Sequence, residues 1–358
     1  MTSRREFLTS AGTSLVSLGA GQAAELPVDQ TAHRGLTSDI SRARRLHRDS
    51  VVIVIHDHNP IAADIEPMRI GGVTAKVYQL LVDVDPVRDY RASGAQRIGW
   101  MAKALAEIRR VGATVENHSD QLLLATTAAD FERAKQSGRQ AVMIGVEGGK
   151  LLEGDLAHLQ TFYDLGLREL QLRWAVPNQI VERETLTSFG IDVVRACQRL
   201  GIIVGLTHMP SKAYYETIDL MVKPPIVSHG SAAGAGRGQD DRSLKALASA
   251  GGVLGIHFYS SYLGDKPHVR RVVDHIDYVA QLVGIETVAL GVDFFPTTGG
   301  WRELQLAQGT TSISWAIESL QQMPRVTEAL VARNYSDDAI RAVLGGNFLR
   351  VCREVFGA

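Results

Sequence analysis

The chain has 358 residues, of which 45% are hydrophobic and 22% charged, a composition typical of a soluble globular enzyme. Its 38 basic and 39 acidic residues leave a formal net charge of −1 with no basic stripe, which argues against nucleic acid as a partner. The two cysteines, Cys197 and Cys352, both fall in predicted helices, so we expect buried thiols, although the sequence leaves a bridge between them open. Any metal must therefore be held by histidine and carboxylate side chains.

The N-terminus carries the pattern of an export signal. Arg4 and Arg5 precede a Phe-Leu pair, a weakly apolar segment at 11–20 and a small-residue sequence at 21–24. This order resembles a twin-arginine signal, so we predict that residues 1–24 lie outside the fold. We accordingly expect the twin-arginine export machinery as a partner and a periplasmic or extracellular location. Residues 25–50 are a polar lead-in segment with a short predicted helix at 40–48.

From residue 51 onward, apolar runs alternate with amphipathic segments. The predicted strands are 51–55, 73–82, 122–124, 141–146, 169–174, 202–206, 225–228, 253–258 and 288–292. The predicted helices are 95–111, 128–135, 156–163, 189–200, 244–250, 269–283, 312–330 and 336–356. This alternation predicts an α/β fold, a single (β/α)8 TIM barrel over 51–358 with additional C-terminal helices. A barrel needs eight strands, so the weak run at 122–124 is the surplus one. No Gly-x-Gly-x-x-Gly follows a strand, which disfavours a dinucleotide-binding sheet.

Polar residues able to bind a metal follow several of these strands. They are His56, His58, Glu147, His208, His229 and Asp293. Each taken alone has an ordinary explanation as a helix cap or a buried hydrogen-bonded side chain. In a barrel, however, the carboxyl ends of all strands open on one face, which holds the active site. Together the six residues therefore predict a metal centre.

The ligand set is too large for a single catalytic zinc, which usually takes three protein ligands and a water. It suits two metal ions that share Glu147, hold a hydroxide between them and leave Asp293 to move a proton. The donor types favour Zn²⁺, two per chain, with Mn²⁺ or another divalent ion as the alternative. We expect His257, His268 and His275 to be structural or surface residues.

Several longer motifs resemble the membrane (renal) dipeptidase family of the amidohydrolase superfamily. They are Gly-Val-Glu147-Gly-Gly, Leu186-Thr-Ser-Phe-Gly-Ile-Asp-Val-Val, Thr207-His208, Ser228-His229-Gly-Ser-Ala, His275-Ile-Asp-Tyr-Val and Leu344-Gly-Gly-Asn-Phe-Leu-Arg350-Val. The resemblance implies a (β/α)8 barrel with two zinc ions that cleaves dipeptides, often with a D-residue on the C-terminal side.

The resemblance also implies roles for individual residues. It places His56 and residue 58 on the first metal, Glu147 as the bridge, and His208 and His229 on the second metal. Asp293 matches the catalytic aspartate of the family. Arg237 matches the arginine that holds the substrate carboxylate, with a gap in the spacing.

The chain departs from the family pattern at three places. The family's usual His-x-Asp on the first strand is His-Asp-His here, so that His58 replaces an aspartate. After the fifth strand, Arg173 and Trp174 stand where the family often has a substrate-binding His or Tyr, and Asp-Phe-Asp-Gly becomes Asp-Phe-Phe-Pro from Asp293. Arg173 and Trp174 are therefore candidate substrate-binding residues, with packing beneath a loop as the structural alternative.

These observations predict an exported, binuclear zinc-dependent hydrolase, a metalloprotease of the dipeptidase type. Its expected partner is a small dipeptide-like substrate whose amide bond is attacked by metal-bound hydroxide. One alternative is an amidase or lactonase of the same superfamily with a different substrate. A second is a non-catalytic periplasmic binding protein. We leave the oligomeric state open, with a homodimer as the candidate assembly.

Overall fold

The computed structural model describes residues 30–80, 83, 99–174, 176–264, 266–297, 300–307, 309 and 313–357. The predicted export signal at 1–24 lies outside these residues, as do 81–82 and 95–98 of a predicted strand and helix. The chain divides into two units, Met1–Ser38 and Asp39–Ala358. Helix α1, Gln30–Asp49, contains the predicted helix at 40–48 and begins earlier. Among the described residues, no helix is both long and apolar enough to cross a membrane.

Eight parallel strands of the second unit close into a barrel. Following the ring, these are β1 Ile53–Asp57, β2 Ala75–Leu80, β4 Gln140–Glu147, β5 Leu167–Gln171, β8 Ile203–Gly205, β9 Ile226–Gly230, β10 Val253–His257 and β11 Val288–Gly291. Pairing of β2 with β4 and of β1 with β11 closes the ring. Every residue of β1, β2, β4, β9, β10 and β11 is buried, as expected for parallel strands covered on both faces. The predicted (β/α)8 barrel is confirmed.

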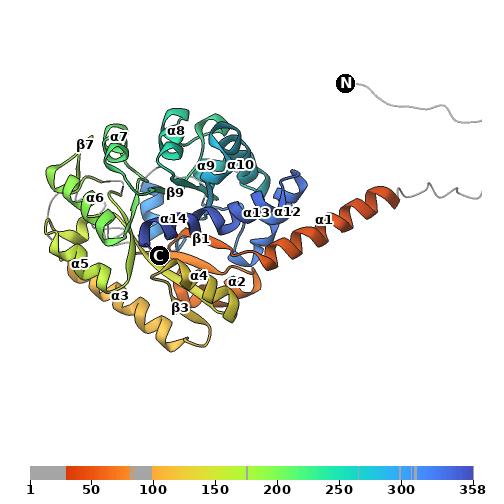
Figure 1. Ribbon diagram of the computed structural model, residues 1–358, viewed down its shortest axis with the longest axis horizontal. Helices are drawn as coiled ribbons and strands as arrows, with labels where there is room; N and C mark the ends of the chain where they lie inside the picture. Colours follow the sequence, from red (N-terminus) through yellow and green to blue (C-terminus); the bar gives the residue numbers. More distant parts are fainter. Residues whose placement is uncertain are drawn as a thin grey trace, which may run out of the picture. The chain divides into compact units, whose positions relative to one another are not determined.

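Helices surround this ring (Figure 1). In chain order they are α2 Ile61–Ile70, α3 Trp100–Asn117, α4 Ala128–Ser137, α5 Ala157–Asp164, α6 Ser188–Leu200, α7 Ser211–Leu220, α8 Asp241–Ser249, α9 Ser260–Leu263, α10 Val269–Val283, α11 Gly300–Ala307, α12 Pro324–Ala332, α13 Asp337–Arg341 and α14 Asn347–Phe356. Their ends follow local chemistry. The Thr187 side chain caps α6 by accepting the Gly190 N–H, and Gly201, at φ 84°, ends that helix. Helices α2, α7, α9 and α11 were not predicted from the sequence.

The surplus strand is real but lies outside the ring. Strand β3, Leu122–Leu124, pairs with the start of β4, while β5 pairs with the later part of β4. A short antiparallel hairpin, β6 Val181–Glu182 with β7 Thr185–Leu186, follows β5. Both cysteines are buried and free, Cys197 in α6 and Cys352 in α14, as predicted.

Two predicted C-terminal helices need correction. Residues 313–319 are not helical, because Trp315 forms a bridge with Tyr259 and the helix starts only at Pro324, a residue suited to a first turn. The predicted helix 336–356 is interrupted by a π-helical turn at Ala342–Gly346. There Gly345 approaches β1 so closely that an added Cβ would lie 2.3 Å from the Val51 carbonyl oxygen. This close packing interrupts the helix, and the hydrophobic periodicity of the sequence does not reveal it.

A buried ion cluster supports the end of β1. The register between β1 and β2 shifts between Val54 and Asp57, and a bulge of this kind can redirect side chains. Asp57 turns away from the barrel interior and accepts a hydrogen bond from the Lys76 ammonium at 2.7 Å. The same ammonium donates to Asp64 of α2 at 2.6 Å and to the Asn59 carbonyl at 2.8 Å. Lys76 is fully buried, so this cluster ties β1, β2 and α2 together.

Replacing Lys76 with methionine should destabilise the fold by about 3–5 kcal/mol, because Asp57 and Asp64 would remain buried without a counter-charge. Urea unfolding of K76M against the wild type measures the loss. The matched control is K245M, since Lys245 is exposed on α8. A loss below about 1 kcal/mol in K76M would contradict the structural role assigned to the cluster.

Candidate metal centre and active site

The carboxyl ends of the barrel strands bring all six predicted metal-competent residues together. His56 lies on β1, Glu147 ends β4, and His229 lies on β9. His58, His208 and Asp293 follow the ends of β1, β8 and β11. Together with His257, the six residues form three overlapping groups, and within each group the donor atoms lie within 4.8 Å of one another. The groups are His56–His58–Glu147, Glu147–His208–His229 and His229–His257–Asp293.

Glu147 is the shared member of two groups, and its two oxygens face different histidines. Oε2 lies 3.1 Å from Nε2 of His58, and Oε1 lies 2.9 Å from Nε2 of His208. His229 Nε2 is 3.6 Å from the same Oε1. This is the arrangement that a carboxylate bridging two cations requires.

The imidazole orientations fit metal binding. His58 Nδ1 lies 3.1 Å from the Gln79 carbonyl oxygen, to which only a protonated Nδ1 can donate. The Ser228 hydroxyl lies 3.0 Å from Nδ1 of His56 and 3.2 Å from Nδ1 of His229. A hydrogen bond donated by Nδ1, as at His58, leaves Nε2 free to coordinate. The Nε2 atoms face each other at 3.1 Å in the pair His56–His58, a contact that a cation between the lone pairs would stabilise.

Electrostatics favour the ligand form of both carboxylates and of His229. Burial works to raise the pKa of Glu147, but hydrogen bonds from His208 and His58 outweigh it and hold that pKa well below the usual range. For Asp293, burial is likewise outweighed by His229, His257 and His56, so its pKa is also held well below the usual range. Burial holds the pKa of His229 well below its ordinary value. Ionised carboxylates and neutral imidazoles are the forms that bind metal ions. At His58, burial works to lower the pKa, but the hydrogen bond and charge of Glu147 outweigh it and raise that pKa, so a cation bound there would displace a proton.

Asp293 and His208 share an uncommon backbone conformation. Their φ angles are 56° and 64°, in the left-handed region that costs a non-glycine residue on the order of 1–3 kcal/mol. The Asp293 N–H donates to the His56 carbonyl oxygen at 3.0 Å, and its carbonyl oxygen accepts from the Trp315 indole at 2.9 Å. These contacts hold the Asp293 carboxylate beside the histidines, with Oδ1 3.5 Å from Nε2 of His56.

His257 belongs to the centre, although we expected a structural or surface role for it. It ends β10, is buried, and its Nε2 lies 3.1 Å from Oδ2 of Asp293. The Tyr259 N–H donates to its Nδ1 at 3.0 Å, which places the proton of the neutral ring on Nε2, facing Asp293. His257 therefore donates a hydrogen bond to Asp293. A polar residue at the end of a buried strand was the available signal, but Phe258 extends the apolar run and concealed it.

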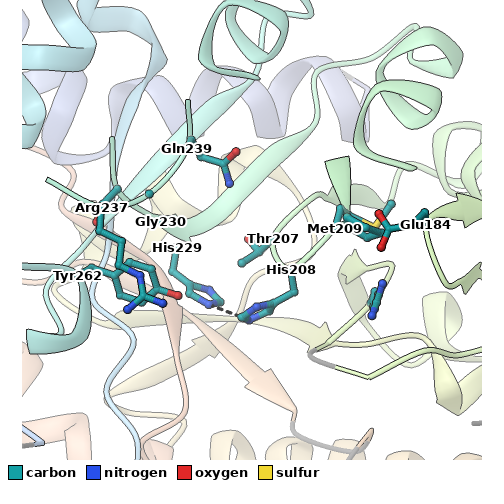
Figure 2. Close-up of a pocket in the computed structure, with 13 residues that line it drawn as sticks. Glu184, Thr207, His208, Met209, His229, Gly230, Arg237, Gln239 and Tyr262 are labelled. Carbon is teal, nitrogen blue, oxygen red and sulfur yellow. Dashed lines mark hydrogen bonds between the residues drawn. The ribbon is translucent and has the colours of Figure 1, made fainter. Parts of the chain in front are cut away.

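A cavity of about 420 Å³ opens beside His208 and His229 (Figure 2). Arg237 and Arg173, two of the predicted substrate-binding residues, both line it. Trp174 is buried with its ring centroid 6.3 Å from that of His208, and it packs with Val176 and Leu304. The structure thus brings Trp174 beside the centre, where it also has the packing role considered as its alternative.

Comparisons with known proteins agree with this geometry. A model of the membrane dipeptidase family, peptidase family M19, matches residues 42–357. Among curated proteins, the chain is 30% identical over 306 residues to a dipeptidase named tcpJ from Claviceps purpurea, covering 82% of this chain and 69% of that protein.

Solved structures share the fold. An amidohydrolase from Pseudomonas aeruginosa superposes with a TM-score of 0.79 at 24% identity, covering 88% of this chain and 99% of that one. A metallopeptidase from Rhodobacter sphaeroides, liganded with a phosphinate mimic of the dipeptide L-Ala-D-Ala, gives a TM-score of 0.74 at 20% identity. That match covers 86% of this chain and 100% of the other.

Replacing Glu147 with glutamine should remove the bridge, since an amide is neutral and has one oxygen where the carboxylate faces His58 with one and His208 with the other. We expect the amount of divalent metal bound per chain to fall by about half or more. Elemental analysis of the purified proteins measures this. E116Q, an exposed change on α3, is the matched control. Full retention of metal by E147Q would rule out the bridging role.

Proposed function

The chain belongs to the membrane dipeptidase family and is a metal-dependent dipeptidase of that type; from this premise we propose that it is a binuclear zinc hydrolase of dipeptides, exported from the cytoplasm. The observation that carries the binuclear proposal is Glu147, which faces His58 with one carboxylate oxygen and His208 with the other. Its dipeptidase relative and its active-site geometry favour an enzyme over a non-catalytic binding protein.

In this proposal, His56 and His58 hold one ion, His208 and His229 hold the other, and Glu147 joins them. When bound, the two ions supply Lewis acidity, lowering the pKa of a water molecule and polarising the scissile carbonyl. The nitrogen and oxygen donors suit zinc. The Nδ1 atoms of His58 and His56 already have hydrogen-bond partners within the protein, the Gln79 carbonyl and the Ser228 hydroxyl.

Asp293 is the proton carrier in the proposed reaction. Its carboxylate is ionised and lies beside the histidines, so it accepts a proton from the attacking water and delivers it to the leaving amine. The hydrogen bond from His257 fixes Oδ2 and leaves Oδ1 directed toward His56. His257 is thus a positioning residue for Asp293.

The substrate proposal is a dipeptide whose C-terminal carboxylate binds Arg237. The guanidinium of Arg237 lines the cavity and stacks over the Tyr262 ring at 5.5 Å. Among the described residues, Arg237 forms no ion pair with a carboxylate. Bidentate binding of a carboxylate would satisfy this guanidinium and place the peptide bond beside His208 and His229.

Replacing Asp293 with asparagine should reduce kcat by about 10²- to 10⁴-fold on a dipeptide such as Ala-D-Ala while bound metal is retained, because only proton transfer is lost. H257Q should reduce kcat by about 10- to 100-fold with little change in KM, since it acts through Asp293. Steady-state kinetics with parallel metal analysis measure both effects. Full activity of metal-loaded D293N, or wild-type turnover that survives complete chelation, would contradict the mechanism.

The export proposal rests on Arg4 and Arg5 and the apolar segment that follows them. Replacing both with lysine should leave the unprocessed chain in the cytoplasm, because twin-arginine signals require the arginine pair. Cell fractionation with immunoblotting measures the distribution. The matched control changes the exposed pair Arg44 and Arg45 of α1 to lysine. Equal export of both double variants would exclude this route.

A further inference from the structure

The cavity beside the metal centre is charged at both ends. Figure 2 shows Arg237 and Tyr262 at one end, Glu184 and Met209 at the other, and the imidazoles of His208 and His229 between them. If Arg237 holds the C-terminal carboxylate and the scissile bond lies over the histidines, the amino-terminal residue of the substrate extends toward Glu184. That direction rests on the function proposed above.

Arg173 also lines the cavity and interacts electrostatically with Glu184. Its Nη1 donates to the Arg183 carbonyl oxygen at 2.9 Å, which fixes the guanidinium against the β6–β7 hairpin. Its Nε is buried and has no hydrogen-bond partner in the part of the chain that the structure describes. Because leaving a buried N–H donor without an acceptor is costly, this Nε indicates that a ligand supplies the acceptor.

The rest of the cavity wall agrees with a charged ligand. Thr207, Ser231 and Gln239 contribute polar groups to it. The apolar part of the wall comes from Met209, Pro210 and the aromatic ring of Tyr262. A long apolar side chain would find little surface to bury here, whereas a carboxylate would find a guanidinium.

We propose that Arg173 and Glu184 form a subsite that selects dipeptides with an acidic amino-terminal residue. Arg173 binds the side-chain carboxylate through Nε and a terminal nitrogen, and Glu184 binds the α-ammonium group. The two charges of the subsite, one positive and one negative, match the two charges of an amino-terminal glutamate or aspartate. The subsite is separate from the contact of Arg237 with the C-terminal carboxylate.

The test compares Glu-D-Ala with Gln-D-Ala, which have nearly the same shape and differ in one charge. For the metal-loaded wild type, we expect kcat/KM to be about tenfold higher for Glu-D-Ala, with the difference mainly in KM, because a buried charge-assisted pair adds ground-state binding. In R173Q, kcat/KM for Glu-D-Ala should fall by about tenfold more than kcat/KM for Gln-D-Ala, so that the preference disappears. R173K keeps the positive charge but cannot bind a carboxylate through two nitrogens, so it should retain part of the preference for Glu-D-Ala.

The matched control is R183Q, which removes the same charge from the adjacent hairpin and should leave the preference intact, because the Arg183 contact to Arg173 comes from the backbone. E184Q should raise KM for both substrates, since both carry the α-ammonium. Equal kcat/KM for the two substrates in the wild type, or equal losses for both in R173Q, would overturn the subsite while leaving dipeptidase function intact. If the metal-loaded wild type cleaves none of the three dipeptides, Glu-D-Ala, Gln-D-Ala and Ala-D-Ala, the proposed function itself is overturned.

Discussion

One buried carboxylate organises the centre. Glu147 ends the longest barrel strand, is almost fully buried, and must remain ionised to face histidines on both sides. A buried anion of this kind is stable only if positive or hydrogen-bonding groups surround it. The imidazoles of His58 and His208 meet that requirement in the protein, and bound cations would meet it more fully. Closure of the barrel brings the ends of β1, β8 and β9, where His58, His208 and His229 lie, close to the end of β4.

The surrounding structure fixes the backbone conformations of the site residues and keeps a separate buried charge cluster apart from them. His208 and Asp293 keep left-handed backbone conformations because strand-end hydrogen bonds fix the residues around them. Asp57, which ends β1 between His56 and His58, points away from the centre to the buried Lys76 and so separates the structural charge cluster from the catalytic one. The same strand therefore serves stability with one residue and metal binding with its neighbours.

The sequence predicted the barrel and six residues of the centre because both follow from local pattern. Most of the buried strands are apolar runs, and His56, Glu147 or Asp293 appears where such a run meets polar residues. His257 was missed because the apolar Phe258 follows it, so its role depends on a tertiary contact to Asp293. The break at Gly345 likewise depends on the approach of Val51 from a distant part of the chain. The hydrophobic periodicity of the sequence reveals neither of these tertiary contacts.

The replacement of the family's aspartate by His58 changes the charge of the centre as well as a ligand. With histidine there, the residues proposed to hold the metals carry one negative charge fewer than a His-x-Asp site would. Two divalent cations would then be less fully neutralised, and their field would reach further into the adjoining cavity. Such a field favours anionic groups on the substrate. The buried Nε of Arg173, which has no hydrogen-bond partner among the described residues, would favour an anionic group in the same cavity.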